Sequence, residues 1–451
     1  MKKFNLFCNY VVILLFAGLS IHPCIAQTTK KEHVEKVYAI SPTGSLDVLS
    51  ARSNVELLTW DRNEVKIVGE LTYEGSDDKE DIAKLVNAFK NMSVESSYNV
   101  LKVNLILIKH TETSNFSIFG FFSRVKTTTI LHNDDKTSLN ANVNKIKTAY
   151  TIWIPATLNV KANSRFGKIN MASVQGNVDF TLSNNNLEME DFGGSGIFDI
   201  RFSSVNIGSG GTLKVNANNS TVNAAEVQNV TINSRFSNFN IVKAHDVSID
   251  INNGTAVFGM LNDINASARF STVRIESNAG KSKFEFNNST LFGKNFQTME
   301  ISARFSKFNA ATIGDTKINL SNNSNYDFST VNTLSCRESR FSTFKIGEIA
   351  VEASFPDATN SQLDILGTSA SFTGFSGNFR FGTVNLKLHP SILYNLNYSG
   401  TFGQLNGISP DKFKTRYVSE KNGSSTSIQG LNADAKCNID LVARNTNIKI
   451  E

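Results

Sequence analysis

Cysteine and histidine are scarce in this chain, and each scarcity excludes a class of site. The six histidines stand singly, and none has a partner at the spacing of metal ligands, so the sequence predicts no zinc centre. Two of the four cysteines lie in the first 26 residues. The other two, Cys336 and Cys437, are compatible with one disulfide in an oxidising compartment and equally with two buried thiols.

Strong net charge is also missing. The chain has 45 lysines and arginines against 40 acidic residues, and removal of Lys2 and Lys3 with a leader brings the two signs closer still. Such a balance gives no bulk attraction to nucleic acid or to an anionic lipid surface. We therefore expect no nucleic-acid partner.

Catalytic motifs are absent as well. The sequence holds no phosphate-binding glycine loop and no nucleophile-elbow pentapeptide. Residues 193–196 are one near miss to a calcium-binding β-roll repeat, because Phe198 stands where that repeat needs aspartate. We expect no enzyme, no catalytic residue and no cofactor. Paired carboxylates like those of glycan-cleaving enzymes are not expected either, because the candidate aspartates stand at different positions within their repeat units and form no obvious pair. These aspartates are Asp179, Asp199, Asp246, Asp250 and Asp263.

The first 26 residues have the form of a secretory signal peptide. They begin with lysines, continue through an apolar run over residues 11–17 and offer the small residue Ala26 before the expected cut. Cys24 leaves a second interpretation open, the acylated cysteine of a lipoprotein, although Pro23 fits that motif poorly. No later stretch is apolar enough to span a membrane as a helix. We expect a chain exported to the periplasm or the outer surface of a bacterium, and not an integral membrane protein.

What the chain does have is a phrase that recurs seven times: Arg-Phe, then Ser or Gly, then any residue, then an apolar residue. Successive copies are 34 to 40 residues apart. Self-similarity at such a period indicates a stacked repeat architecture rather than a globular enzyme. The arginines that begin the phrase are Arg165, Arg201, Arg235, Arg269, Arg304, Arg340 and Arg380.

A second phrase, Asn-Asn followed by Ser or Gly, lies halfway between copies of the first. The two phrases divide residues 165–380 into thirteen units of about 18 residues, the length of one solenoid turn. Residues before each phrase alternate with period two, so we predict an all-β, single-chain β-solenoid whose rungs are built from strands. The second phrase begins at Asn218, Asn252, Asn287 and Asn322, with looser versions at Ser183 and Thr359.

The position of a residue within its unit predicts whether its side chain points inward or outward. Two positions after the start of a phrase a small residue is expected to form a tight corner, and two positions further an apolar residue such as Phe308 is expected to face inward. The alternation also predicts that the phenylalanine of each Arg-Phe pair points inward. It would stack there with the second asparagine of the intervening phrase, in a phenylalanine and asparagine spine. Each arginine should then point outward.

The outward arginines form a possible binding stripe. Members two rungs apart are separated by about 9.6 Å, and such a column could hold an anionic glycan. Alternatively, each guanidinium could bond to the corner backbone and keep the edge soluble. A second candidate contact surface is an aromatic loop, either folded onto the cap or exposed as a tip for a membrane or protein partner. Its phenylalanines are Phe116, Phe119, Phe121 and Phe122.

The rest of the chain is expected to cover the first and last rungs, which would otherwise expose sheet edges. We predict a leader over residues 1–26 and an N-terminal β-rich cap over 27–160 with one helix over about 78–92. The solenoid rungs should occupy 161–390, and further rungs, a loop and a cap should occupy 391–451.

With these features the chain resembles the adhesin families of uncharacterised bacterial envelope proteins, including the GIN domain. The resemblance is carried by strands on either side of Thr-Trp-Asp at residues 59–61, by Ile-Trp-Ile-Pro at residues 152–155, and by the serial rungs that follow. It implies an exported β-solenoid with an adhesive role, and it supplies no functional residues to carry over.

We therefore expect a non-enzymatic, adhesin-like protein that binds a surface, a glycan or a protein partner at the cell envelope. Two other functions stay open at this point. One is a polysaccharide-active β-helix enzyme, and the other is a periplasmic scaffold or envelope-signalling component.

Overall fold

The computed structural model describes residues 29–74, 79–118, 122–131, 139–141 and 143–451, and most of them lie in strands. They belong to two compact units. One unit comprises the described residues within 29–35, 68–92 and 107–149, and the other comprises residues 36–67, 93–106 and 150–451. The expected leader lies outside the described residues. Among the described residues, no helix is both long and apolar enough to cross a membrane.

The smaller unit carries helix α2 (Lys79–Lys90), close to the expected bounds. Leu85 and Phe89, one turn apart, are buried, as in an amphipathic helix with one packed face. An antiparallel sheet in this unit consists of β7 (Ile108–Ile118), β8 (Phe122–Leu131) and β9 (Leu139–Ala141). Three strands have residues in both units: β1 (Thr29–Ala39), β4 (Glu64–Glu74) and β10 (Asn144–Pro155).

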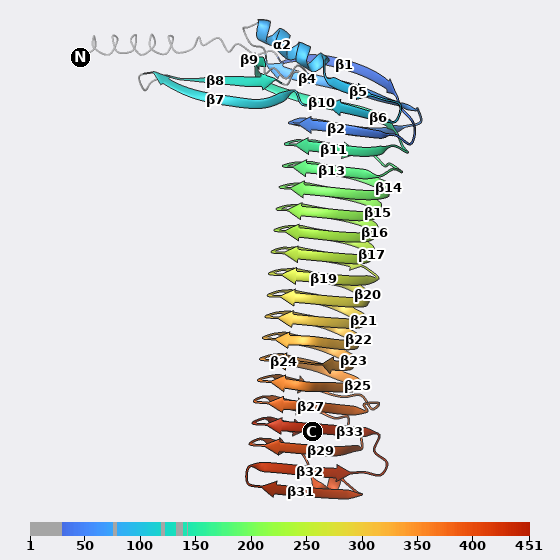
Figure 1. The fold of residues 1–451 in the computed structure, drawn as a ribbon, viewed down its shortest axis with the longest axis vertical. Coiled ribbons are helices and arrows are strands. Elements are labelled where there is room, and N and C mark those ends of the chain that lie inside the picture. Colours follow the sequence, from blue (N-terminus) through green and yellow to red (C-terminus); the bar gives the residue numbers. More distant parts are fainter. Residues whose placement is uncertain (1–28, 75–78, 119–121, 132–138, 142) are drawn as a thin grey trace, which may run out of the picture. The chain divides into compact units, whose positions relative to one another are not determined.

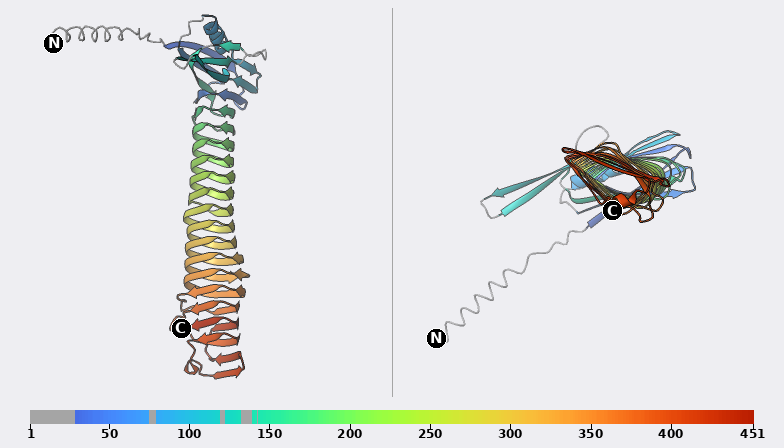
Figure 2. Two further views of the ribbon diagram at one scale, coloured as in Figure 1. Left: turned by 90° about the vertical axis from the view of Figure 1, so that its left-hand side faces the viewer. Right: turned by 90° about the horizontal axis from the view of Figure 1, so that it is seen from below.

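The larger unit is a parallel β-solenoid, as the repeat predicts. Figure 1 shows its parallel strands stacked with their arrowheads at one edge, and the end-on view in Figure 2 shows the rungs overlying one another. Its strands are β2 (Ser45–Ala51), β3 (Ser53–Trp60), β5 (Ser93–Ser96), β6 (Val100–Asn104), β11 (Asn159–Arg165), β12 (Lys168–Met171), β13 (Val178–Ser183), β14 (Asn186–Arg201), β15 (Ser204–Asn218), β16 (Thr221–Arg235), β17 (Asn238–Asn252), β18 (Thr255–Met260), β19 (Asp263–Arg269), β20 (Thr272–Asn287), β21 (Thr290–Arg304), β22 (Lys307–Asn322), β23 (Asn325–Cys336), β24 (Ser339–Arg340), β25 (Thr343–Thr359), β26 (Gln362–Ile365), β27 (Gly374–Arg380), β28 (Thr383–Leu386), β29 (Tyr394–Thr401), β30 (Gln404–Asn406), β31 (Arg416–Asn422), β32 (Ser425–Leu431), β33 (Cys437–Arg444) and β34 (Asn447–Ile450), with a short 3-10 helix at Pro410–Lys412.

The core is built from columns of apolar residues in register on successive rungs. The expected inward column, four positions after the start of each phrase, is buried throughout the thirteen units. Where it is aromatic, its rings stack: the centroids of Phe308 and Tyr326 are 5.3 Å apart, and those of Tyr326 and Phe344 are 4.7 Å apart. Offset stacking of this kind adds to the free energy gained by burying the rings.

The predicted phenylalanine and asparagine spine is wrong. The phenylalanine of every Arg-Phe pair is 55 to 61 % exposed, and the paired asparagines are exposed as well. Each of these residues has a left-handed backbone, with φ between 49° and 55°. The strand ends at the residue before, so the left-handed turn directs two successive side chains outward and breaks the alternation on which the prediction relied. The corrected positions are Phe166, Phe202, Phe236, Phe270, Phe305, Phe341 and Phe381, with Asn219, Asn253, Asn288, Asn323 and Asn360 between them.

A ladder of buried serines closes each corner from the inside. The hydroxyl of Ser289 donates to the carbonyl oxygen of Asn287, two residues earlier, at 2.9 Å, and it accepts the backbone N–H of Ser271 on the preceding rung at 3.2 Å. The N–H of Ser289 donates in turn to the hydroxyl of Ser306 at 3.2 Å. A glycine interrupts the ladder at residue 254. The other serines of the ladder are Ser203, Ser220, Ser237, Ser324, Ser342 and Ser361.

Antiparallel hairpins close both ends of the solenoid. At the N-terminal end, β6 pairs with β2 in parallel and with β5 antiparallel. At the other end the chain leaves a gap and returns to fill it, because β33 lies between β27 and β29. Beyond β29, the strands β32 and β31 pair antiparallel. A change from parallel to antiparallel pairing thus ends the regular stack of rungs.

The two remaining cysteines are buried free thiols, so the disulfide interpretation is wrong. Cys336 lies on β23 and Cys437 on β33, with β25 and β27 between them. Three rung steps correspond to about 14 Å, whereas a disulfide spans Cα atoms no more than about 7 Å apart. Burial raises the pKa of the Cys336 thiol to about 12 and that of the Cys437 thiol to about 11.

The ladder predicts the effect of removing one hydroxyl. Ser289→Ala should lower the free energy of unfolding by about 1–3 kcal/mol, because the buried N–H of Ser271 then has no acceptor. Urea denaturation followed by circular dichroism measures the change. Ser248→Ala, at an exposed position, should change it by less than about 0.5 kcal/mol. Equal effects of the two substitutions would refute the role given to the ladder.

Candidate binding edge

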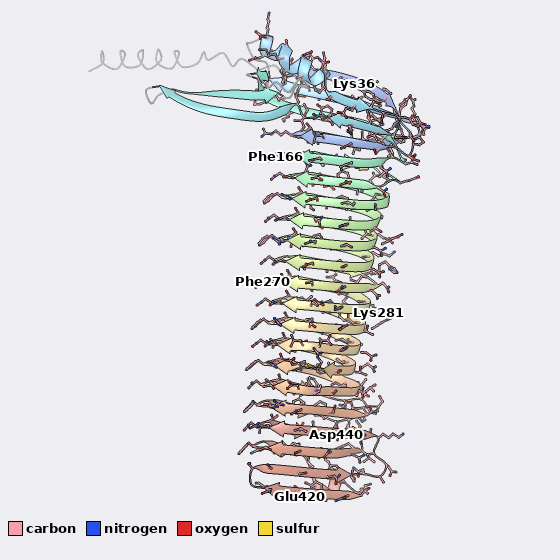
Figure 3. All side chains as sticks on the ribbon, viewed as in Figure 1. Lys36, Phe166, Phe270, Lys281, Glu420 and Asp440 are labelled. Atoms are coloured by element: carbon pink, nitrogen blue, oxygen red, sulfur yellow. The ribbon has the colours of Figure 1, made fainter. Side chains whose placement is uncertain are left out.

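The Arg-Phe pairs lie in one row along the corner of the solenoid where the strands end. We call this row, together with the asparagine corners between its members, the Arg-Phe edge. Figure 3 places Phe166 and Phe270 at this edge and Lys281 at the opposite side. The pairs are Arg165/Phe166, Arg201/Phe202, Arg235/Phe236, Arg269/Phe270, Arg304/Phe305, Arg340/Phe341 and Arg380/Phe381.

Strand register places the pairs on alternate rungs. Arg235 is in register with Asn218 on one neighbouring rung and with Asn252 on the other. Each pair therefore recurs after two rungs, or about 9.6 Å. At the first pair of the row, the guanidinium of Arg52 lies 5.8 Å from the centroid of the Phe166 ring. The edge is thus a regular series of exposed aromatic and cationic groups on alternate rungs.

The arginines of the edge are exposed, as expected, and are largely free of acidic neighbours. Within the described part of the chain, Arg340 is the only one of the seven with a carboxylate at ion-pair distance, the Glu338 side chain at 2.9 Å. Because a guanidinium carries five donors in a planar fork, the other six can donate hydrogen bonds to a carboxylate or sulfate of a ligand.

The intervening corners present amides instead of rings. The side-chain amide of Asn288 donates to the side-chain oxygen of Asn287 at 2.7 Å, and Asn323 does the same to Asn322. Asparagine tolerates the left-handed conformation, whereas a bulky residue there is strained by about 1–2 kcal/mol. The fold therefore accepts asparagine at this corner at no evident disadvantage, and phenylalanine is not required for the turn.

A column of polar residues runs beside the edge, two positions after each corner residue, and eleven of its thirteen members carry a hydroxyl or an amide. We call it the hydroxyl-amide column. A hollow of about 570 Å³ joins the two features, since its lining includes Phe202, Asn219 and Thr221. In register, the column comprises Lys168, Asn186, Ser204, Thr221, Asn238, Thr255, Thr272, Thr290, Lys307, Asn325, Thr343, Gln362 and Thr383.

A longer groove of about 870 Å³ lies on another part of the solenoid, across rungs from β16 to β23. The expectation that no two of the candidate aspartates form a pair is wrong, because Asp246 and Asp263 in the lining of this groove are register neighbours on adjacent rungs. Both stand six positions before the next corner phrase, a signal present in the sequence. Both carboxylates are already engaged: Asp263 accepts the backbone N–H of Lys281 at 2.8 Å, and Asp246 lies 3.1 Å from the ring of His245.

The second candidate surface is only partly described. Phe116 lies on β7 and Phe122 begins β8, so these two positions belong to strands and not to the expected loop. Phe119 and Phe121 lie outside the described residues. In the described ranges, no three His, Cys, Asp or Glu side chains gather in a way that could hold a metal ion.

Comparisons with known proteins add little. No protein-family model matches the chain, and no curated protein matches it. A solved structure of a protein from Clostridium sporogenes, provisionally assigned to cell adhesion, aligns over 94 % of this chain and 100 % of its own, with 8 % identity and a TM-score of 0.16. That score is too low for the alignment to support any inference about function.

The geometry predicts opposite effects for two phenylalanines. Phe270→Asn should leave the free energy of unfolding unchanged or raise it by up to about 1 kcal/mol, because asparagine suits the left-handed corner. Phe284→Asn, at a fully buried position, should lower it by at least about 3 kcal/mol. Urea titration of both variants tests this. A large loss at residue 270 would contradict the outward placement.

Proposed function

We propose that this protein is an exported, non-enzymatic, adhesin-like binding protein, and that the Arg-Phe edge holds its partner at the bacterial cell envelope. The observation that carries the proposal is the recurrence of an exposed, strained phenylalanine at corners that asparagine occupies on the intervening rungs. Packing does not explain these rings, since more than half of each side chain is exposed. Backbone strain that the fold does not need is a reason to consider function.

Several further features support a binding role. Aromatic and arginine side chains are the residues most enriched in the energetic centres of binding surfaces. On this edge their backbone positions are fixed by the sheet register, so docking of a partner requires no ordering of the backbone. The signal-peptide form of residues 1–26 and the resemblance to envelope adhesin families support export.

One observation favours a second candidate, a polysaccharide-active enzyme. Asp246 and Asp263 lie side by side in a groove, as catalytic carboxylates of glycan-cleaving enzymes do. Their existing hydrogen bonds and contacts, however, suit a bracing role at the bend of the rung. A defined turnover activity abolished by Asp246→Asn would favour the enzyme. A periplasmic scaffold would use the same edge, and protease added to intact cells would distinguish it from a surface adhesin.

The proposal predicts that binding depends on the edge. Replacing Phe236, Phe270 and Phe305 together by asparagine should weaken binding to envelope fractions of the producing bacterium at least tenfold, because three aromatic contacts are lost. Sedimentation or biolayer interferometry with the purified mature chain measures the effect.

A matched control replaces three other exposed apolar residues, which lie off the edge. The triple change Ile197→Asn, Val242→Asn and Met260→Asn removes comparable exposed apolar surface and should leave binding within twofold of the parent. If both triple variants bind like the parent, or if both lose binding equally, the edge is not the binding surface.

A further inference from the structure

We propose that the ligand of the Arg-Phe edge is a linear acidic polysaccharide that lies along the solenoid axis, with one disaccharide repeat on each Arg-Phe pair. This inference rests on the proposed function and specifies its ligand class. Four observations carry it: the spacing of the pairs, the chemistry of the ring, the unpaired arginines, and the polar column beside them.

The spacing calls for a ligand that repeats. The seven pairs are related by the same two-rung step of about 9.6 Å, fixed by backbone register along the whole row. A ligand contacts all of them equivalently only if it has a translational repeat of similar length. Two pyranose rings in an extended chain cover a comparable distance, whereas two residues of an extended peptide cover only about 6.8 Å.

The rings and the polar column suit sugars. The face of a pyranose ring carries C–H groups that pack against an aromatic face, and its hydroxyls need donors and acceptors at the margin. The hydroxyl-amide column supplies a hydroxyl or an amide on eleven of its thirteen rungs, hence two for most of the disaccharides. Near Phe202 the hollow of about 570 Å³ includes Ser204 and Thr221 from this column together with the ring.

The arginines of the edge favour a ligand that carries acidic groups. An arginine recurs with each ring, and six of the seven have no carboxylate at ion-pair distance in the described structure. A carboxylate or sulfate once in every disaccharide would meet one guanidinium each time, and such charge-assisted contacts are stronger than neutral hydrogen bonds. The column adds two further cations, Lys168 beside the Arg165/Phe166 pair and Lys307 beside the Arg304/Phe305 pair.

A polyproline-type peptide is the competing occupant, because three of its residues rise by about 9.3 Å. It fits the ring spacing almost as well. It does not offer an acidic group at every repeat to meet the arginines, and its backbone lacks the density of hydroxyls that would use the polar column. We therefore favour the polysaccharide, and the peptide becomes an outcome of the test.

Oligosaccharide length gives the sharpest test, because a row of equivalent sites produces avidity. Calorimetry or interferometry should be run on the mature chain with size-defined hyaluronan and alginate oligosaccharides from tetra- to dodecasaccharide. For at least one series, the dissociation constant should fall at least tenfold from the shortest to the longest. The dissociation constant should rise as the salt concentration is raised above about 0.15 M, because the exposed charges become screened.

Two variants separate the contributions of ring and charge. Phe236→Asn with Phe270→Asn and Phe305→Asn should abolish the length dependence. Arg235→Gln with Arg269→Gln and Arg304→Gln should weaken acidic oligosaccharides at least tenfold and leave any binding of neutral chitin oligosaccharides unchanged. The off-edge triple variant at Ile197, Val242 and Met260 should behave as the parent.

The outcomes are distinguishable from those of the proposed function. If the phenylalanine variant loses binding to envelope fractions but no acidic oligosaccharide binds with length dependence, the binding function stands and the ligand assignment is overturned. The assignment is also overturned if poly-L-glutamate binds as tightly as the acidic oligosaccharides, or if poly-L-proline is the better ligand. If envelope binding is independent of the edge, both proposals fall.

Discussion

The hydrogen bonds of the serine at each corner determine which side chains of the turn point into the core and which point into solvent. An inward serine satisfies the backbone of its own turn and of the neighbouring turn, and this position is reached only if the residue before it adopts a left-handed conformation. A buried N–H without an acceptor would destabilise each corner by about 1–3 kcal/mol. The turn that makes the serine ladder possible also directs the corner residue into solvent.

This constraint separates the stabilising residues from the residues available for binding. The inward columns of valine, isoleucine, leucine and aromatic residues form a continuous core that each rung shares only with its neighbours. The corner residue contributes little to that core, so the turn accepts either asparagine or phenylalanine. Under the proposed function, binding of a partner accounts for the alternation of the two along one edge, and strain of about 1–2 kcal/mol at each phenylalanine is tolerated.

Much of the architecture can be read from the sequence. The seven Arg-Phe phrases and the asparagine phrases between them predict the solenoid, its rung length, the small residue at the corner, the inward column at residues such as Phe308, and the outward arginines. These features depend on local repetition, which periodicity reveals directly. The pairing of Asp246 with Asp263 was also accessible, because both precede the next corner phrase by the same number of residues.

Other features depend on geometry that periodicity does not contain. The inward placement of Phe270 and its equivalents was predicted by continuing a two-residue alternation through the corner, although a single left-handed residue reverses it. The insertion of β33 between β27 and β29 joins segments that are not consecutive in the chain. The separation of Cys336 and Cys437 follows from the number of rungs between their strands, and sequence distance alone does not give it.

The outward position of the corner phenylalanines is tested most directly by thiol accessibility. Phe270→Cys and, as a buried counterpart, Phe284→Cys should be compared in a chain that begins at Gln27, where Cys336 and Cys437 serve as buried internal references. In native protein near pH 8, the thiol at residue 270 should react with a thiol reagent at the rate of an exposed cysteine, while the thiol at residue 284 should react only after unfolding. Protection at residue 270, or equal reactivity at both positions, would contradict the account.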